Sequence, residues 1–148
     1  MKRVIIDWTY PMGMDNIVSH NRMDDIGLYY ITRNFGGNVS DLYIGKTTYS
    51  YGSRLWHHYM NWLDDYRGTK QVRLGYIISP KNVSKENLRA LINDAEETII
   101  WLMRHSLIHN QKCMKDCYPK NRLYITNIGY RGNLPAEMCF SDEEWYGV

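Results

Sequence analysis

Two short segments of alternating side chains constrain the fold of this chain most strongly. Residues 27–32, GLYYIT, form a candidate strand in which Tyr29 points to the same face as the glycine that opens it. Residues 42–44, LYI, form the returning strand, and the glycines and asparagines between the two segments are typical of a turn-rich loop. The sequence therefore predicts a hairpin with a loop insert, across which Tyr29 and Tyr43 can meet.

A helix and a third strand are expected after this hairpin. From Ser53 onward the apolar residues recur at helical spacing, and Arg54 and His58 stand four positions apart beside that apolar stripe. Residues four positions apart lie on one face of a helix, so both side chains can point into one cleft. Residues 71–78, QVRLGYII, form a strand that must stop before Pro80.

A longer helix follows, with Ser84 as its N-cap and its end near Met103. Its apolar stripe consists of Leu88, Leu91, Ile92, Ala95, Ile99, Leu102 and Met103. At about 100° per residue, Glu96 lies on the edge of this stripe and Glu97 lies nearly opposite its centre. Glu96 is therefore expected to reach into a cleft, and Glu97 is expected to be solvated.

Composition places the chain among ordinary globular domains. It has 148 residues, of which 44% are hydrophobic and 23% charged, and a formal charge of only +2, which gives no strong signal for a polyanionic partner. No apolar run is long enough to cross a bilayer and no signal peptide is recognisable, so a cytoplasmic location is expected. The three cysteines, Cys113, Cys117 and Cys139, are an odd number and are expected to be free thiols.

Four motifs together resemble the GIY-YIG nuclease family, whose name spells out its two signature strands. They are GLY at residues 27–29, YIG at residues 43–45, the helix that carries Arg54 and His58, and AEETIIW at residues 95–101. The last of these looks like the family's glutamate helix, with Glu96 as its glutamate. The asparagine that the family carries after this helix is best matched by Asn110, so the resemblance covers residues 27–110.

The resemblance implies an α+β fold in a single domain over residues 1–148. The core at residues 27–110 is expected to be a small three-stranded mixed or antiparallel sheet flanked by helices. Residues 111–148 are expected to form a C-terminal extension, in which residues 122–127 predict a further strand. Residues 2–6, KRVII, predict a short strand before the core.

The resemblance also implies metal-dependent hydrolysis of phosphodiester bonds in DNA. The implied catalytic set is Tyr29, Tyr43, Arg54, His58 and Glu96, with Glu96 as the ligand of Mg²⁺ or Mn²⁺. In the family pattern Tyr29 takes the proton of the attacking water, Tyr43 supports it and His58 assists. The residues alone leave open whether Tyr29 or His58 is the base, because a tyrosine pKa of about 10 must be lowered by a nearby cation. Arg54 is always protonated and its planar donors fit phosphate oxygens, so it can stabilise the charge of the transition state.

Basic residues that could contact DNA phosphates are scattered along the chain. They are Arg3, Lys81, Lys85, Arg89, Lys112, Lys115, Lys120, Arg122 and Arg131. Because little sequence lies outside the catalytic module, target choice is expected to come from its loops, from a homodimer or from the shape of the nucleic acid.

Two other interpretations are open at this point. One is a nucleic-acid-binding module of the same fold that does not cleave. The other is a zinc-dependent interaction domain built on His105, His109, Cys113 and Cys117, which recur at every fourth position. On one helix these four residues would spread along a rod beyond the reach of a single tetrahedral ion, which favours free thiols instead.

Overall fold

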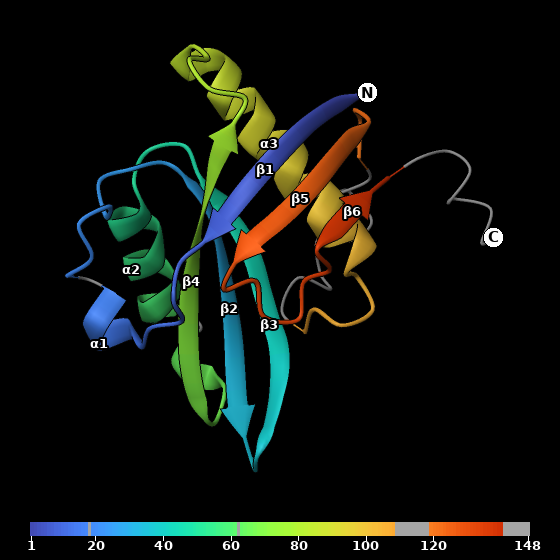
Figure 1. Ribbon diagram of the computed structural model, residues 1–148. Helices are drawn as coiled ribbons and strands as arrows, with labels where there is room; N and C mark the ends of the chain where they lie inside the picture. The colour runs from blue at the N-terminus through green and yellow to red at the C-terminus, as the bar shows by residue number, and fades with distance from the viewer. Residues whose placement is uncertain (18, 62, 109–118, 141–148) are drawn as a thin grey trace.

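The computed structural model describes residues 1–17, 19–61, 63–108 and 119–140, and their helices and strands form an α+β fold (Figure 1). The strands are β1 (Lys2–Trp8), β2 (Gly27–Phe35), β3 (Asn38–Thr47), β4 (Thr69–Ser79), β5 (Leu123–Gly129) and β6 (Glu137–Cys139). The helices are α1 (Met14–Ile17), α2 (Tyr51–Asn61) and α3 (Lys85–Leu102), with a 3-10 turn, η1, at Leu63–Asp65. Within these described ranges, no helix is both long enough and apolar enough to cross a membrane.

The sheet has six strands in the order β3-β2-β4-β1-β5-β6, so the predicted three-stranded sheet is wrong. The expected core strands do lie together as β3-β2-β4, with antiparallel pairing throughout. The predicted strand at residues 2–6 becomes β1, which pairs antiparallel with β4 and parallel with β5, and β6 closes the far edge. The sheet is therefore mixed, and half of it comes from outside the three strands expected.

Trp8 shows why β1 belongs to this sheet and is not an isolated arm. Its side chain is only 1% exposed and its ring lies over Gly75 of β4, where an added Cβ would come within 2.7 Å of the indole. The indole nitrogen donates a hydrogen bond of 2.9 Å to Oδ1 of Asn127 in β5. One buried side chain thus joins β1 to both of its neighbours.

The hairpin of β2 and β3 is longer than expected, and the predicted loop insert is wrong. Pairing continues through Arg33↔Ser40 and Phe35↔Asn38, so only Gly36 and Gly37 form the turn. Both glycines have positive φ, 62° and 82°, which is what a two-residue hairpin turn that matches the strand twist requires. The insert's polar residues are therefore strand residues on a solvated part of the hairpin.

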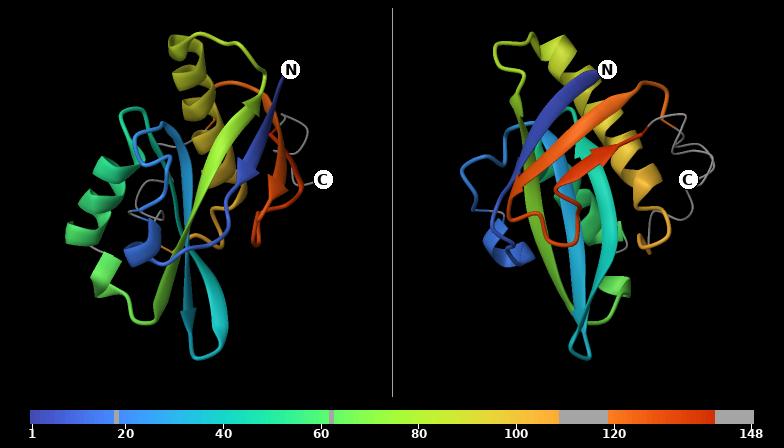
Figure 2. Two further views of the ribbon diagram at one scale, coloured as in Figure 1. Left: turned by 60° about the vertical axis from the view of Figure 1, so that its left-hand side comes forward. Right: turned by 45° about the vertical axis from the view of Figure 1, so that its right-hand side comes forward.

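Helices lie on both sides of the sheet (Figures 1 and 2), and two apolar clusters lie on its opposite faces. On one face α3 packs on a cluster that includes Val4, Ile6, Trp8, Leu28, Tyr30, Ile92 and Ile99. On the other face α1 and α2 cover a cluster that includes Ile17, Tyr29, Ile31, Tyr51, Leu55 and Val72. Alternate residues of β2 therefore serve different helices, as a strand buried on both faces requires.

The helix expected from Ser84 to about Met103 is confirmed as α3. The Ser84 hydroxyl accepts a hydrogen bond of 3.1 Å from the backbone nitrogen of Asn87, which caps the helix start. The helix ends at Leu102, so His105 lies in a turn and does not continue a helical row.

Candidate functional site

Tyr29 and Tyr43 meet across the hairpin, as the alternation predicts. Tyr29 of β2 pairs with Gly45 of β3, and Tyr43 pairs with Ile31 two positions further along β2. The two rings are stacked, with centroids 5.9 Å apart and planes inclined by 24°. Tyr29 is completely buried at 0% exposure, whereas Tyr43 is only partly buried.

Gly45, the glycine of the YIG segment, is required by this stacking. A Cβ at Gly45 would overlap the Tyr29 hydroxyl and would come within 2.6 Å of Cε1 of Tyr43. Gly27, the glycine of the GLY segment, has a similar role, because a Cβ there would overlap the hydroxyl of Tyr51. That hydroxyl donates a hydrogen bond of 3.0 Å to the carbonyl oxygen of Gly75 and so ties α2 to the sheet.

Arg54 reaches the phenols from α2. The helix is anchored by the buried side chains of Tyr51 and Leu55, and Arg54 precedes Leu55 on the exposed side. The guanidinium acts on the pKa of both Tyr29 and Tyr43 through its charge and through hydrogen bonding. Arg54 and the two phenols therefore belong to one electrostatic cluster.

Glu96 reaches the same cluster from α3, on the other face of the sheet. Its side chain is 18% exposed, and its Oε1 lies 3.7 Å from the ammonium of Lys46, which follows Gly45 on β3. The Lys46 ammonium also hydrogen-bonds to the side-chain oxygen of Asn93. Because β3 is an edge strand, groups from both faces of the sheet can meet around it.

Burial sets the direction of most pKa shifts in this cluster. It raises the pKa of Tyr29 and of Tyr43 above the ordinary tyrosine value, and Glu96 raises both further, while the charge of Arg54 opposes the rise. Burial also raises the pKa of Glu96, against the charges of Lys46 and Arg54. For Arg54, burial acts to lower the pKa, but the two phenols more than offset it and the pKa is raised. The cluster therefore holds a permanent cation beside groups that resist ionisation.

Four of the five predicted site residues converge: Tyr29, Tyr43, Arg54 and Glu96. His58 belongs to α2 one turn after Arg54, but its side chain lies outside the described residues, as does the whole of Asn110.

Sequence reasoning missed two members of this neighbourhood. Asn93 binds Lys46, and its position one turn before Glu96 on α3 is the signal that could have found it. Glu97 was expected to be solvated, which is wrong, because it is partly buried. Its Oε1 accepts a hydrogen bond of 3.4 Å from Asn93, while its Oε2 is buried without a hydrogen-bond partner.

The predicted zinc ligands do not form a described cluster. His105 is exposed in the turn after α3, whereas His109, Cys113 and Cys117 lie outside the described residues. In the part of the chain that the structure describes, no three His, Cys, Asp or Glu side chains gather as metal ligands.

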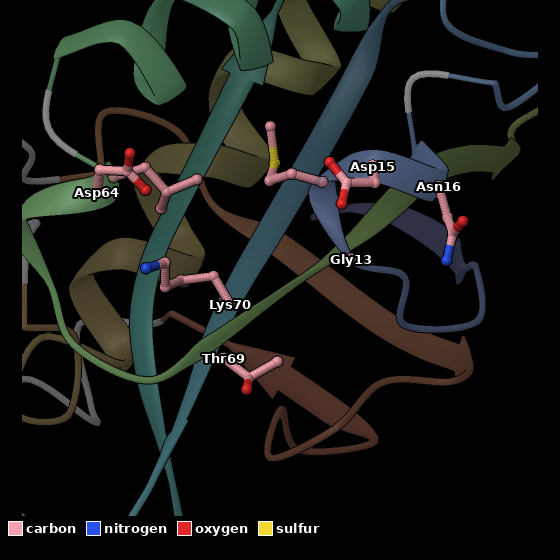
Figure 3. Close-up of a pocket in the computed structure, with 8 residues that line it drawn as sticks. Gly13, Asp15, Asn16, Asp64, Thr69 and Lys70 are labelled. Carbon is pink, nitrogen blue, oxygen red and sulfur yellow. The ribbon is translucent and has the colours of Figure 1, made fainter.

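A hollow of about 270 Å³ lies apart from this cluster, between α1, η1 and the start of β4 (Figure 3). Asp15 and Asp64 line it together with Lys70, whose ammonium donates a hydrogen bond of 2.8 Å to the carbonyl oxygen of Tyr66. None of the predicted site residues lines it.

Comparison of the chain with protein-family models, with curated proteins and with solved structures gives no match. The interpretation of the cluster therefore depends on its own residues and geometry.

Replacement of Gly45 by alanine tests the close approach of the two strands. We expect Gly45→Ala to destabilise the protein by about 1–3 kcal/mol, because the new methyl group overlaps the Tyr29 phenol. Gly52→Ala is the matched control. Gly52 lies in α2, and a Cβ there would be 3.6 Å from the carbonyl oxygen of Met23, which is ordinary contact. This change should stabilise the helix by about 0.4–1 kcal/mol. Urea unfolding of both variants measures the difference, and equal stability of the two would contradict the packing described.

The raised pKa of Glu96 predicts a pH-dependent cost to folding. A carboxyl group whose pKa is higher in the folded than in the unfolded protein destabilises the fold when it ionises. The loss of stability therefore begins as the pH rises above the pKa of the group in the unfolded protein. Wild type should therefore lose stability relative to Glu96→Gln as the pH rises from about 4 upward. Thermal unfolding across this range measures it, and a relative gain by wild type would mean that Lys46 and Arg54 outweigh burial.

Proposed function

We propose that this chain is a metal-dependent endonuclease of the GIY-YIG type that hydrolyses phosphodiester bonds in DNA. The observation that carries the proposal is the convergence of the Arg54 guanidinium, the Glu96 carboxylate and two stacked phenols around one edge strand. These side chains come from β2, β3, α2 and α3, and burial of ionisable groups from separate elements in one cluster is typical of functional sites.

Arg54 suits the charge that develops during phosphodiester hydrolysis. The attack of water places negative charge on the phosphate oxygens, and a planar guanidinium can bind two of them at once. Arg54 is on the exposed side of α2, and its pKa is raised, so it remains a cation at any working pH. It is therefore the group that would hold the scissile phosphate against the phenols.

The choice of base depends on which group can meet a water molecule. Tyr29 is completely buried, whereas Tyr43 is partly exposed and stacks on it. This arrangement favours Tyr43 as the phenol in contact with the incoming water and Tyr29 as its support, the reverse of the roles that the family resemblance implies. His58 is the alternative base, one turn along α2 from Arg54.

Glu96 could bind a divalent metal ion, and one neighbouring cation competes for its carboxylate. Mg²⁺ usually keeps several of its waters and binds proteins through one or two carboxylates and the substrate phosphate, so a three-ligand cage is unnecessary. Glu96 offers one carboxylate, and the buried Oε2 of Glu97, which has no hydrogen-bond partner, lies on the next residue of α3. Lys46 is the competitor, because its ammonium lies 3.7 Å from Oε1 of Glu96. A magnesium or manganese ion held there supplies a Lewis acid for the leaving oxygen.

The proposal also covers a candidate stacking residue, the location of the protein, its substrate and its assembly. Tyr49 in the loop after β3 is 87% exposed and could stack on an unpaired base. A cytoplasmic location, DNA as the substrate and assembly into a homodimer belong to the proposal as well. The non-cleaving nucleic-acid-binding module is the competing function, since the same surface can bind DNA without cutting it.

Plasmid nicking tests the proposed activity. Purified protein with Mg²⁺ should convert supercoiled plasmid to the nicked form, and EDTA should stop it. Glu96→Gln should slow nicking at least about a hundredfold, because a metal-bound oxygen contributes several kcal/mol to the transition state. Glu86→Gln, which changes an exposed carboxylate in the first turn of α3, is the control and should nick like wild type. DNA binding without nicking by wild type would favour the non-cleaving module.

The pH dependence of nicking separates a phenol from His58 as the base. Burial raises the pKa of both Tyr29 and Tyr43, so with a phenol as the base the logarithm of the single-turnover rate should rise with a slope of about 1 from about pH 7 to about pH 9. Tyr43→Phe should remove this rise. A histidine base would instead give a plateau above about pH 7, and such a plateau, unchanged in Tyr43→Phe, would assign the base to His58.

A further inference from the structure

Two exposed cations on α3 share a helix face with Glu96. Lys85 and Arg89 are four positions apart, and at about 100° per residue Arg89 lies about 40° and Glu96 about 20° from the direction of Lys85. Asn93 continues the same side of the helix and binds Lys46, which comes from β3. Lys81 lies in the loop just before α3. We call Lys81, Lys85, Arg89 and Lys46 the α3 cation row.

In the part of the chain that the structure describes, the two helical members of the α3 cation row have no acidic partner. Lys85 and Arg89 are exposed, and among the described residues neither forms an ion pair with a carboxylate. Glu86 is the acidic residue closest in sequence, and it forms no ion pair with Arg89. Among the described residues, the positive charges of Lys85 and Arg89 are therefore not paired, although the whole chain carries a formal charge of only +2.

The α3 cation row extends from the end of the sheet to the candidate site. In Figure 1 α3 begins beyond the end of β4 and runs down behind β1 and β5. Eleven residues at 1.5 Å each place Lys85 about 16 Å from Glu96 along the helix axis. At 3.4 Å per base step this distance corresponds to about five base steps of duplex DNA. The row is thus long enough to contact several successive phosphates.

The same side of α3 is unsuited to a membrane surface. A helix that lies on lipid presents large apolar side chains beside its cations. The large apolar side chains that are exposed in the described part of the chain include Tyr49 and Trp56, but none of them belongs to α3. Charge without exposed apolar groups is the pattern of a surface that binds the phosphate backbone.

We propose that the α3 cation row binds the phosphodiester backbone of DNA and directs the strand toward Glu96. This inference rests on the proposed nuclease function and adds to it the path of the substrate. It contributes affinity without sequence preference, because lysine and arginine contacts to phosphates position the nucleic acid and do not distinguish bases. Several cations that are scattered along the sequence become one track because α3 and β3 lie side by side in the fold.

Fluorescence anisotropy tests the α3 cation row by measuring the binding of a labelled duplex of about 20 base pairs. The measurements are made between about 50 and 200 mM salt. EDTA is present to prevent cutting. Lys85→Ala and Arg89→Ala should each weaken binding at least about threefold and reduce the slope of log K against log salt by about 1. Arg67→Ala, which removes an exposed cation just before the start of β4, is the matched control and should bind like wild type. In the nicking reaction the row variants should raise KM and leave kcat unchanged.

The results of these assays distinguish a failure of the α3 cation row from a failure of the nuclease proposal. Unchanged affinity and salt slope in Lys85→Ala and Arg89→Ala, with wild type binding and nicking DNA, would overturn the row and leave the nuclease proposal standing. Wild type that neither binds nor nicks DNA would overturn both. If vesicles rich in phosphatidylserine bind wild type but not the row variants, while duplex binding is equal in all of them, the row belongs to a membrane surface and this inference is wrong.

Discussion

The close approach of the Tyr29 phenol to the backbone of Gly45 is the contact on which the arrangement of the cluster depends. It is possible only because Gly45 lacks a side chain, and it brings Tyr29 beneath Tyr43 as a stacked pair. The phenols then provide the surface that Arg54 meets from α2, so the position of the cation follows from the packing of the strands. A glycine on an edge strand thus determines where three polar groups lie.

The local part of this arrangement could be predicted from the sequence, because strand alternation and helical periodicity act over a few residues. They predicted that Tyr29 and Tyr43 can meet across the hairpin, put Glu96 at the edge of the apolar stripe of α3, and identified Ser84 as its N-cap. The six-stranded sheet could not be predicted in this way. The parallel pairing of β1 with β5 joins residues more than a hundred positions apart, and it depends on contacts such as Trp8 with Asn127 that no local pattern contains.

The remaining errors have equally physical causes. Gly36 and Gly37 were placed within a loop, although two successive positive φ values are also what the tightest hairpin turn needs. The helical period placed Glu97 in solvent, but it describes only the direction of a side chain from its own helix. It does not include neighbouring strands such as β3, whose Lys46 binds Asn93 beside Glu97. The contact of Lys46 with Glu96 was missed for the same reason, since it joins β3 to α3, which lie far apart in the sequence.

Burial and the proposed function make opposite demands on this cluster. Desolvation raises the pKa of Tyr29, Tyr43 and Glu96 and so favours their neutral forms, whereas metal binding and proton transfer need the anions. Arg54 and Lys46 reduce that conflict, because each lowers the pKa of an acid beside it. A metal ion at Glu96 would do the same more strongly and would displace Lys46 from the carboxylate. The freed ammonium could then bind a phosphate, so arrival of the metal would complete the positive surface that α3 begins.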